Sequence, residues 1–345
     1  MANGCMLPEE IIHSIFLRVP TETLLRLKCL SKYWNRVISD PKFMKSRSRR
    51  MILPPVLPLH AIDNSIQGND MCHSMVKLHC PFLNLFDEVE YIVGTFNGIV
   101  LLVIRKENRL NEMILYNPVS TAFKVVPHPQ GSHFTNHYVY GFGYGTTLDD
   151  LKIVRIAVSG IHSYDIFSLK NESWSSRSKL IGKYHFYHYS GTFVNGFLYW
   201  VAGKESHWPL IVALDIKEKV FSEILIPSGC KWRRLGTFNG RLCMICIQAN
   251  DVELWVMNEH GFGKSWLRKC SSDRASLGGY DNLVCVLDDG KLLCLNYKSQ
   301  KLIVFDMFKE SYKEVNTLIS FGELGKLGGI EYVESLASPS DMLSV

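Results

Sequence analysis

Two cysteines of this sequence, Cys243 and Cys246, have the CxxC spacing of zinc sites and redox dithiols. They lie in an apolar run after a predicted turn, and no second pair stands at the distance of a zinc ribbon, so we interpret them as buried thiols. The chain has 10 cysteines, and its start lacks the basic region and apolar stretch of a secretory signal. We therefore expect reduced thiols rather than a disulfide framework, and a cytoplasmic or nuclear location.

Two further groups of side chains could bind a metal. Cys72, His73, His79 and Cys80 offer soft ligands within nine residues, but without the spacing of a zinc finger. Histidines near tyrosines could serve as copper ligands: His133, His137, His185 and His188. Loop histidines more often face solvent or a partner, so we predict no metal site. The sequence also lacks a Ser-His-Asp order, a phosphate-binding glycine loop and paired carboxylates, so we expect neither catalysis nor a cofactor.

Composition and charge exclude other classes of function. The 345 residues, 47% hydrophobic and 12% aromatic, allow about two domains with a large core. No apolar run approaches the roughly 18 residues of a membrane span. Residues 1–50 contain ten Lys and Arg against four Asp and Glu, whereas the whole chain carries +5. The basic cluster between Lys42 and Arg50 lacks interleaved aromatics, so we interpret it as a solvated linker and predict no nucleic acid partner.

The elements that could position a site begin with short amphipathic helices at the N-terminus. Pro8 suits the first turn of a helix, and Glu9 and Glu10 stabilise the positive end of its dipole. Ile11 and Ile15 share one helical face, so the apolar stripe is wider than one core contact requires. About forty residues cannot build a self-sufficient core. The helices are therefore expected to need a partner.

Two more helices are predicted before the basic linker. Pro20 ends the first helix, and Thr21 can cap a second helix that carries Leu24, Leu25 and Leu27. A third helix is expected from residue 31 to residue 38, ending before Pro41.

The rest of the chain has the pattern of repeated β-hairpins. Gly-Thr-Phe strands or their equivalents precede turns at Asn97-Gly98, Asn195-Gly196, Asn239-Gly240 and Asp289-Gly290, and a fifth, degenerate hairpin is expected near residues 143–150. Asn-Gly favours a type I′ hairpin turn, because both residues tolerate positive φ. Second hairpins are predicted at 114–126, 164–174, 211–226, 253–267 and 301–315, which completes five four-strand units with the period of propeller blades.

The leftover apolar segments predict how a ring would close. Residues 330–336 and the pieces between Met75 and Ile92 remain unpaired, and joining them would make a composite sixth blade. We therefore expect a mainly β fold, a kelch-like β-propeller of six blades preceded by three small helices. Two packed sheets are the alternative, which the regular spacing disfavours.

The N-terminal helices resemble an F-box. The resemblance rests on Leu7-Pro8, the paired acids, the isoleucines, Leu24-Leu25-Arg26, Ser31-Lys32-Tyr33-Trp34 and the final Ser39-Asp40-Pro41-Lys42-Phe43. It implies binding to a Skp-type adaptor within a cullin-RING ubiquitin ligase. The adaptor contacts it suggests are Leu7, Pro8, Ile11, Ile12, Ile15, Leu24, Leu25 and Val37.

The remainder is similar to the plant F-box-associated, kelch-like family. The motifs are Leu115-Tyr116-Asn117-Pro118, Tyr140-Gly141-Phe142-Gly143-Tyr144, Glu253-Leu254-Trp255-Val256-Met257-Asn258 and Tyr332-Val333-Glu334-Ser335-Leu336. Regulators of immune receptors and S-locus F-box proteins are also similar. We expect an F-box at 1–45, a basic and Pro-rich connector leading into the first strands at 46–90, the propeller at 91–338 and a tail at 339–345.

This resemblance implies a substrate-recognition subunit that holds an unidentified target protein for ubiquitination and degradation. Alternatives are a binding scaffold that delivers no ubiquitin, or a galactose-oxidase-like propeller enzyme. Target contacts are expected on loops opposite the Asn-Gly turns, where aromatics and arginines are the usual anchors. The candidates are Arg105, His133, Tyr138, Tyr184, His185, Trp208, Trp232, Arg233 and Arg274.

Overall fold

The fold is described from a computed structural model of the chain. It describes residues 8–19, 21–39, 43, 50–54, 58–63, 75–85, 87–107, 111–129, 137–147, 150–204, 209–227, 229–230, 232–258, 266–277, 282–296, 301–315 and 328–340.

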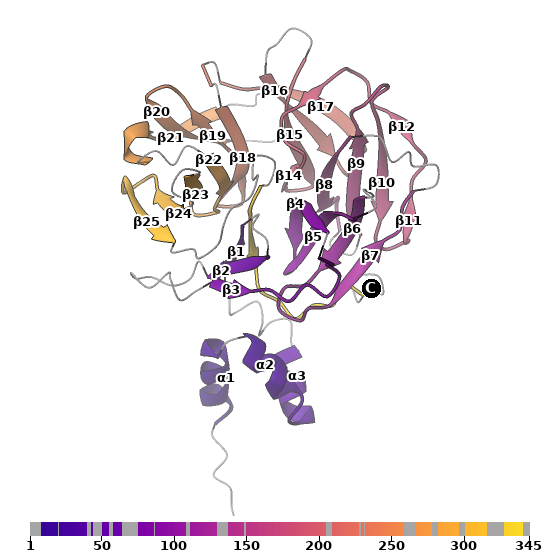
Figure 1. The fold of residues 1–345 in the computed structure, drawn as a ribbon, viewed down its shortest axis with the longest axis vertical. Helices are drawn as coiled ribbons and strands as arrows, with labels where there is room; N and C mark the ends of the chain where they lie inside the picture. The colour runs from indigo at the N-terminus through magenta and orange to yellow at the C-terminus, as the bar shows by residue number, and fades with distance from the viewer. Residues whose placement is uncertain are drawn as a thin grey trace, which may run out of the picture.

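Three short helices form a small domain beneath the strands (Figure 1). They are α1 (Glu9–Arg18), α2 (Thr21–Lys28) and α3 (Lys32–Ser39). Pro8 stands at the N-cap of α1, and the Ser31 hydroxyl accepts the Trp34 amide at 3.1 Å at the start of α3. The predicted three-helix start is confirmed.

Five propeller blades follow one another along the chain, each running from its innermost strand outward (Figure 1). Blade 1 contains β4 (Glu88–Phe96), β5 (Ile99–Arg105), β6 (Asn111–Tyr116) and β7 (Phe123–Val126). Blade 2 contains β8 (Tyr138–Tyr144), β9 (Leu151–Ala157), β10 (Ser163–Ser168) and β11 (Ser173–Trp174), with β12 (Ser178–Lys179) also paired to β10.

In blade 3, two short segments share the innermost position. They are β13 (His185–Phe186) and β14 (Thr192–Val194), and both pair with β15 (Phe197–Gly203), which is followed by β16 (Pro209–Asp215) and β17 (Val220–Leu225). Between them, the chain leaves the sheet and bonds to blade 2, where the Tyr140 amide donates to the Tyr189 carbonyl at 2.7 Å.

Blades 4 and 5 have four strands each. Blade 4 contains β18 (Trp232–Phe238), β19 (Arg241–Ile247), β20 (Asp251–Met257) and β21 (Trp266–Asp273). After the short 3-10 helix η2 (Arg274–Leu277), blade 5 contains β22 (Asn282–Val286), β23 (Lys291–Asn296), β24 (Lys301–Asp306) and β25 (Ser311–Val315).

The sixth blade joins the two ends of the chain, as predicted. Its order is β26-β1-β2-β3, with β1 (Arg50–Leu53), β2 (His60–Asp63) and β3 (Met75–Lys77) from the N-terminal part and β26 (Ile330–Val333) from the C-terminal part. In Figure 1, the yellow β26 lies against the purple β1 at the centre of the ring.

The partner of β26 differs from the one expected. The tail pairs with β1, from Arg50 opposite Val333 to Leu53 opposite Ile330, and not with the pieces between Met75 and Ile92. The sequence pattern hid β1 because basic residues precede it and Pro54 follows it. Met51, Ile52 and Leu53 are all buried, so β1 lacks the alternation of apolar and polar residues from which a half-buried strand is predicted. Residues 46–90 thus supply three strands as well as a connection.

The predicted type I′ turns are confirmed at the three Asn-Gly sites. Asn97, Asn195 and Asn239 have φ of 46°, 47° and 50°, and each following glycine is also positive. At Asp289-Gly290, only the glycine has a positive φ, 84°.

Residues 334–337, here called the strap, leave β26 and cross blade 1. Asn117 donates its side-chain amide to the Ser335 carbonyl at 3.0 Å and to the Ala337 carbonyl at 2.7 Å. The Ser335 hydroxyl donates to the Asn97 carbonyl in the first Asn-Gly turn. The strap is therefore fixed on the face of the propeller that carries these turns.

Candidate functional site

Helix α1 leaves apolar side chains uncovered on one face. Ile11 and Ile15, one turn apart, are 48% and 45% exposed, and Leu30 after α2 is 70% exposed. Pro8 is also exposed at the start of the same helix. Apolar side chains that face solvent do not stabilise the helical domain itself. The face is therefore suited to covering by another protein.

The other proposed adaptor contacts lie deeper. Ile12, Leu25 and Val37 are half-buried, and Ile12 and Val37 pack against the core of the helical domain. Leu24 is 0% exposed inside that core, so it stabilises the domain rather than reaching a partner directly. Leu7 lies outside the described residues.

The strap joins the helical domain to the propeller. The Thr21 hydroxyl at the start of α2 donates to the Glu334 carboxylate, and both residues are buried. Leu336 packs into the helical core with Phe16, Leu24 and Ile38. One C-terminal segment therefore contacts both domains and orients one relative to the other.

The face opposite the Asn-Gly turns carries the expected target contacts. A hairpin places its turn and its free ends on opposite faces, so the starts of the innermost strands and the ends of β5 and β15 meet there. The described candidates at this face are Arg105 ending β5, Tyr138 starting β8, His185 starting β13, Arg233 in β18 and Arg274 after β21. Trp232 starts β18. His133 and Trp208 lie outside the described residues.

Several of these side chains are already engaged within the protein. Arg105 is paired with Glu88 and, at 3.2 Å, with Glu90. The buried Arg155 guanidinium lies 4.3 Å from the ring centroid of Tyr138. Arg274 donates to the Gln248 carbonyl at 3.2 Å. These contacts order the face.

Tyr184 does not lie on an exposed loop as expected. It is 7% exposed, and its hydroxyl donates to Glu223 of β17 at 2.6 Å. Burial raises the pKa of Tyr184, and its hydrogen bond to Glu223 raises it further. The ring is buried because it packs into a hydrophobic cluster with Leu180, Trp200 and Leu210.

Residues that sequence reasoning missed gather between the innermost strands of blades 1 and 2 and the segment that joins β13 to β14. Tyr91 and Tyr189 are stacked at 4.6 Å between ring centroids, and Tyr140 lies 6.1 Å from Tyr91. Burial is the main cause that raises the pKa of Tyr91. Nearby Tyr187 is 46% exposed. The density of tyrosine between 184 and 189 was the available signal.

The central channel has a volume of about 490 Å³. At its turn-side end, Arg50 is 3.3 Å from both Asp288 and Glu331, so these charges are mutually compensated. His188 lies in the wall and donates Nε2 to the Arg233 carbonyl at 3.0 Å.

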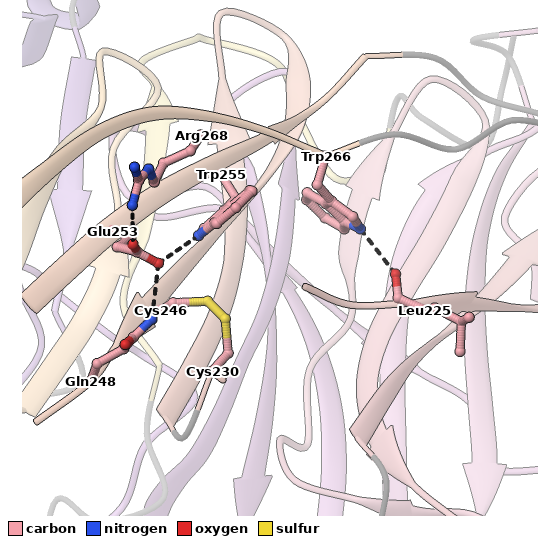
Figure 2. The surroundings of a disulfide bond; sticks show 8 residues. All are labelled: Leu225, Cys230, Cys246, Gln248, Glu253, Trp255, Trp266 and Arg268. Atoms are coloured by element: carbon pink, nitrogen blue, oxygen red, sulfur yellow. Dashed lines mark hydrogen bonds and ion pairs between the residues drawn. A yellow bond between two sulfur atoms is a disulfide. The ribbon is translucent and has the colours of Figure 1, made fainter. Parts of the chain in front are cut away.

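The expectation of reduced thiols is wrong for two cysteines. Cys230 and Cys246 form a disulfide with a Cα–Cα distance of 5.3 Å (Figure 2). The loop between β17 and β18 brings Cys230 beside β19, which no local spacing reveals. Both are buried, at 4% and 0% exposure, so a reductant reaches the bond only after local opening.

The disulfide belongs to the contact between blades 3 and 4. Its cluster includes Trp255 and Trp266, and the Trp266 indole donates to the Leu225 carbonyl of blade 3 at 3.0 Å (Figure 2). Beside it, buried Glu253 accepts bonds from Trp255, Gln248 and Arg268 at 2.9, 3.1 and 2.8 Å. The apolar cluster and the Trp266 indole thus join the two blades, whereas the disulfide ties the linker before β18 to β19 of blade 4.

The CxxC pair does not form a shared ligand set. Positions three apart in a strand point to opposite faces, and Cys243 packs toward blade 5 whereas Cys246 packs toward blade 3. Burial raises the pKa of Cys243, as expected for an inert thiol. His79 and His137 are exposed, and Cys72, His73 and His133 lie outside the described residues. Among the residues with described positions, no cluster of three or more potential ligands is found.

A six-bladed propeller closed by both chain ends, which carries a three-helix domain with an exposed apolar face, defines the class of protein. The chain belongs to the F-box-associated β-propeller family: the family model for the F-box associated beta propeller domain matches residues 59–339, and that for the F-box domain matches residues 5–46.

Relatives span most of this chain. F-box protein CPR1 of Arabidopsis thaliana is 26% identical, over 90% of this chain and 84% of that protein. The F-box/kelch-repeat protein At3g23880 of Arabidopsis thaliana is 25% identical, over 97% of this chain and 96% of that protein. A solved structure, TolB from Acinetobacter baumannii, has a TM-score of 0.41 at 12% identity, over 65% of this chain and 54% of that chain.

An F-box implies binding to a Skp-type adaptor, and the architecture is consistent with a substrate-adaptor role. In the part of the chain whose structure is described, no helix is both long and apolar enough to cross a membrane.

Proposed function

We propose that this protein is the substrate-recognition subunit of a Skp–cullin–F-box ubiquitin ligase, acting in the cytoplasm or nucleus. The observation that carries the proposal is the uncovered pair Ile11 and Ile15 on an F-box helix that is fixed to a propeller. The helices bind the Skp-type adaptor, and the propeller face opposite the strap binds the target protein.

The protein itself catalyses no reaction in this scheme. It holds the target beside the ubiquitin-conjugating enzyme that the cullin carries, which raises the effective concentration of target lysines. The contact between the strap and the F-box core supports this role, because a fixed orientation keeps the target within reach of the enzyme. The target is then degraded.

The adaptor interface is tested by replacing Ile11 and Ile15 together with glutamate. The side chains are half-exposed, so the helices should still fold, whereas two buried charges at an interface should weaken adaptor binding at least about thirtyfold. Binding is measured by titrating purified Skp-type adaptor into the full chain by calorimetry.

The control is Val220→Glu, which changes an exposed apolar residue on the outer strand of blade 3. This variant should bind adaptor like the wild type. Unchanged affinity of the Ile11 and Ile15 variant would refute the adaptor interface. Cullin co-purification, measured in parallel, separates a ligase subunit from a scaffold that delivers no ubiquitin.

A further inference from the structure

Arg233 has an unusual environment near the start of β18, the innermost strand of blade 4. It is half-buried, and its Nε is buried without a hydrogen-bond partner. The Nε of Arg155 is also unsatisfied, but the guanidinium of Arg155 is paired with Asp165 through another nitrogen. Arg234 and Arg274, which are also half-buried, donate to the Leu283 and Gln248 carbonyls, so Arg233 differs in having no polar partner for its guanidinium among the described residues. Buried donors are normally satisfied, so an exception calls for a group supplied from outside.

No carboxylate among the described residues forms an ion pair with Arg233. Burial lowers the pKa of Arg233, and the neighbouring ionisable Tyr187 partly offsets this shift. A guanidinium nonetheless stays protonated in proteins. The His185 ring lies edge-on to Tyr187 at 5.6 Å between centroids. Aromatic rings and a free cation therefore stand together.

The segment of blade 3 that ends at Tyr187, the neighbour of Arg233, presents its side chains alternately outward and inward. Lys183, His185 and Tyr187 are exposed, whereas Tyr184 is buried and Phe186 is half-buried. We call the set His185, Tyr187 and Arg233 the Arg233 surface, because the His185 and Tyr187 rings are in contact and Tyr187 neighbours Arg233.

The charge around this surface is predominantly positive. On the same face, the adjacent blades 2 and 3 carry five described cations, Arg155, Arg177, Lys179, Lys183 and Lys204, against the two carboxylates Asp165 and Glu223. Asp165 is bound by Arg155 and Arg177, and Glu223 is bound by Lys204 and Tyr184. Neither carboxylate is available to neutralise Arg233.

We propose that the Arg233 surface binds an acidic segment of the target protein, with one carboxylate on the Arg233 guanidinium and an apolar residue against the Tyr187 ring. The planar guanidinium matches a carboxylate in two hydrogen bonds, and the neighbouring tyrosine supplies a rigid apolar wall. The inference rests on the proposed function, because it identifies the chemistry of the target that the propeller holds.

The experiment uses the full chain in complex with its adaptor and a display library of random linear peptides. Enriched peptides are synthesised, and their affinities are measured by fluorescence anisotropy. We expect enriched sequences to carry Asp or Glu, and Asp→Asn or Glu→Gln in the peptide to weaken binding at least about tenfold. The Arg233→Gln variant should lose a similar factor.

The matched control is Arg241→Gln, since Arg241 is an exposed arginine at the start of β19 on the opposite face. Its affinity should match the wild type. Arg233→Gln removes an unpaired cation, so its melting temperature should not fall while its peptide affinity does. A purely structural arginine would show the reverse.

Enrichment of peptides without acidic residues, equal binding by the Arg233→Gln variant, or no enrichment at all would overturn the inference. A preference for nucleic acid over acidic peptides in competition would do so as well. Adaptor affinity, measured on the same samples, reports on the proposed function separately, because the F-box helices lie on the other side of the propeller.

Discussion

His188 is a side chain whose protonation is tied to the folded state. Burial is the main cause that lowers its pKa to about 4, and the nearby Arg234 charge lowers it further, whereas its bond to the Arg233 carbonyl opposes the shift. In the unfolded chain, its pKa is about 6.5. The folded protein thus holds a neutral imidazole in the channel wall.

This shift predicts a loss of stability in acid. The stability from neutral His188 is present above pH 6.5 and is lost as the pH falls toward 4, because the unfolded chain binds the proton first. Between neutral pH and pH 5, the free energy of unfolding should fall by on the order of 1–2 kcal/mol through this residue. Urea unfolding of wild type and His188→Asn across this range measures the difference, and parallel pH profiles would contradict it.

Single residues also show how accessibility limits function. Leu24 and Tyr184 have residue types typical of interfaces, but both are buried. Ile11 and Ile15 have the same apolar character as Leu24 and are half-exposed. Their position on the helix, not their type, makes them available to a partner.

At the scale of elements, a comparison of Gly98 and Gly240 distinguishes the cost of backbone strain from the cost of displaced neighbours. Both have a positive φ, 74° and 71°. A Cβ on Gly240 would meet nothing within 4 Å, whereas one on Gly98 would lie 2.7 Å from the Ser335 backbone nitrogen in the strap.

Gly240→Ala should therefore cost about 1 kcal/mol from strain alone. Gly98→Ala should cost about 2 kcal/mol more, because the strap must move. Chemical denaturation of the two variants, each against wild type, measures the difference. Equal losses would show that the strap is not held against this turn.

The disulfide joins elements 16 residues apart. Closing a loop of that size stabilises a protein by about 3 kcal/mol in the chain-entropy model. The double variant Cys230→Ala, Cys246→Ala should melt at a lower temperature than wild type, and a reductant should lower the wild type toward it. Thermal melting with and without dithiothreitol tests this. Cys243→Ala, which removes a free buried thiol, should keep its response to reductant.

At the scale of the whole molecule, ring closure and domain orientation depend on the same C-terminal stretch. β26 completes blade 6, and the strap that follows it contacts the helical core through Leu336. A change there should affect the relation between the domains before it affects either domain alone.

Leu336→Ala should loosen the F-box on the propeller, because this interface loses a partly buried apolar side chain worth about 2 kcal/mol. Small-angle scattering should show a larger radius of gyration, while adaptor affinity stays unchanged. Leu225→Ala, at a residue 81% exposed on blade 3, is the control. Identical scattering from the two variants would contradict a role for the strap in orientation.

Local patterns sufficed for the helices, the Asn-Gly turns and the blade repeat. Pro8, Ile11 and Ile15 set the helix and its apolar face through neighbours at most seven positions away, and Asn97-Gly98 needs only its own backbone preference. Ring closure from both ends was also accessible, because unpaired apolar segments remained after the blades were counted.

Long-range contacts decided the rest. The partner of β26, the Cys230–Cys246 bond and the strap contacts join residues that chain spacing does not relate. Arg233 could be recognised by sequence as an interface type, but its missing partner depends on which carboxylates the other strands bring near it. Sequence determined which elements form, because their interactions are local. Only the tertiary structure decided which side chains are paired, buried or left open, because that depends on every blade at once.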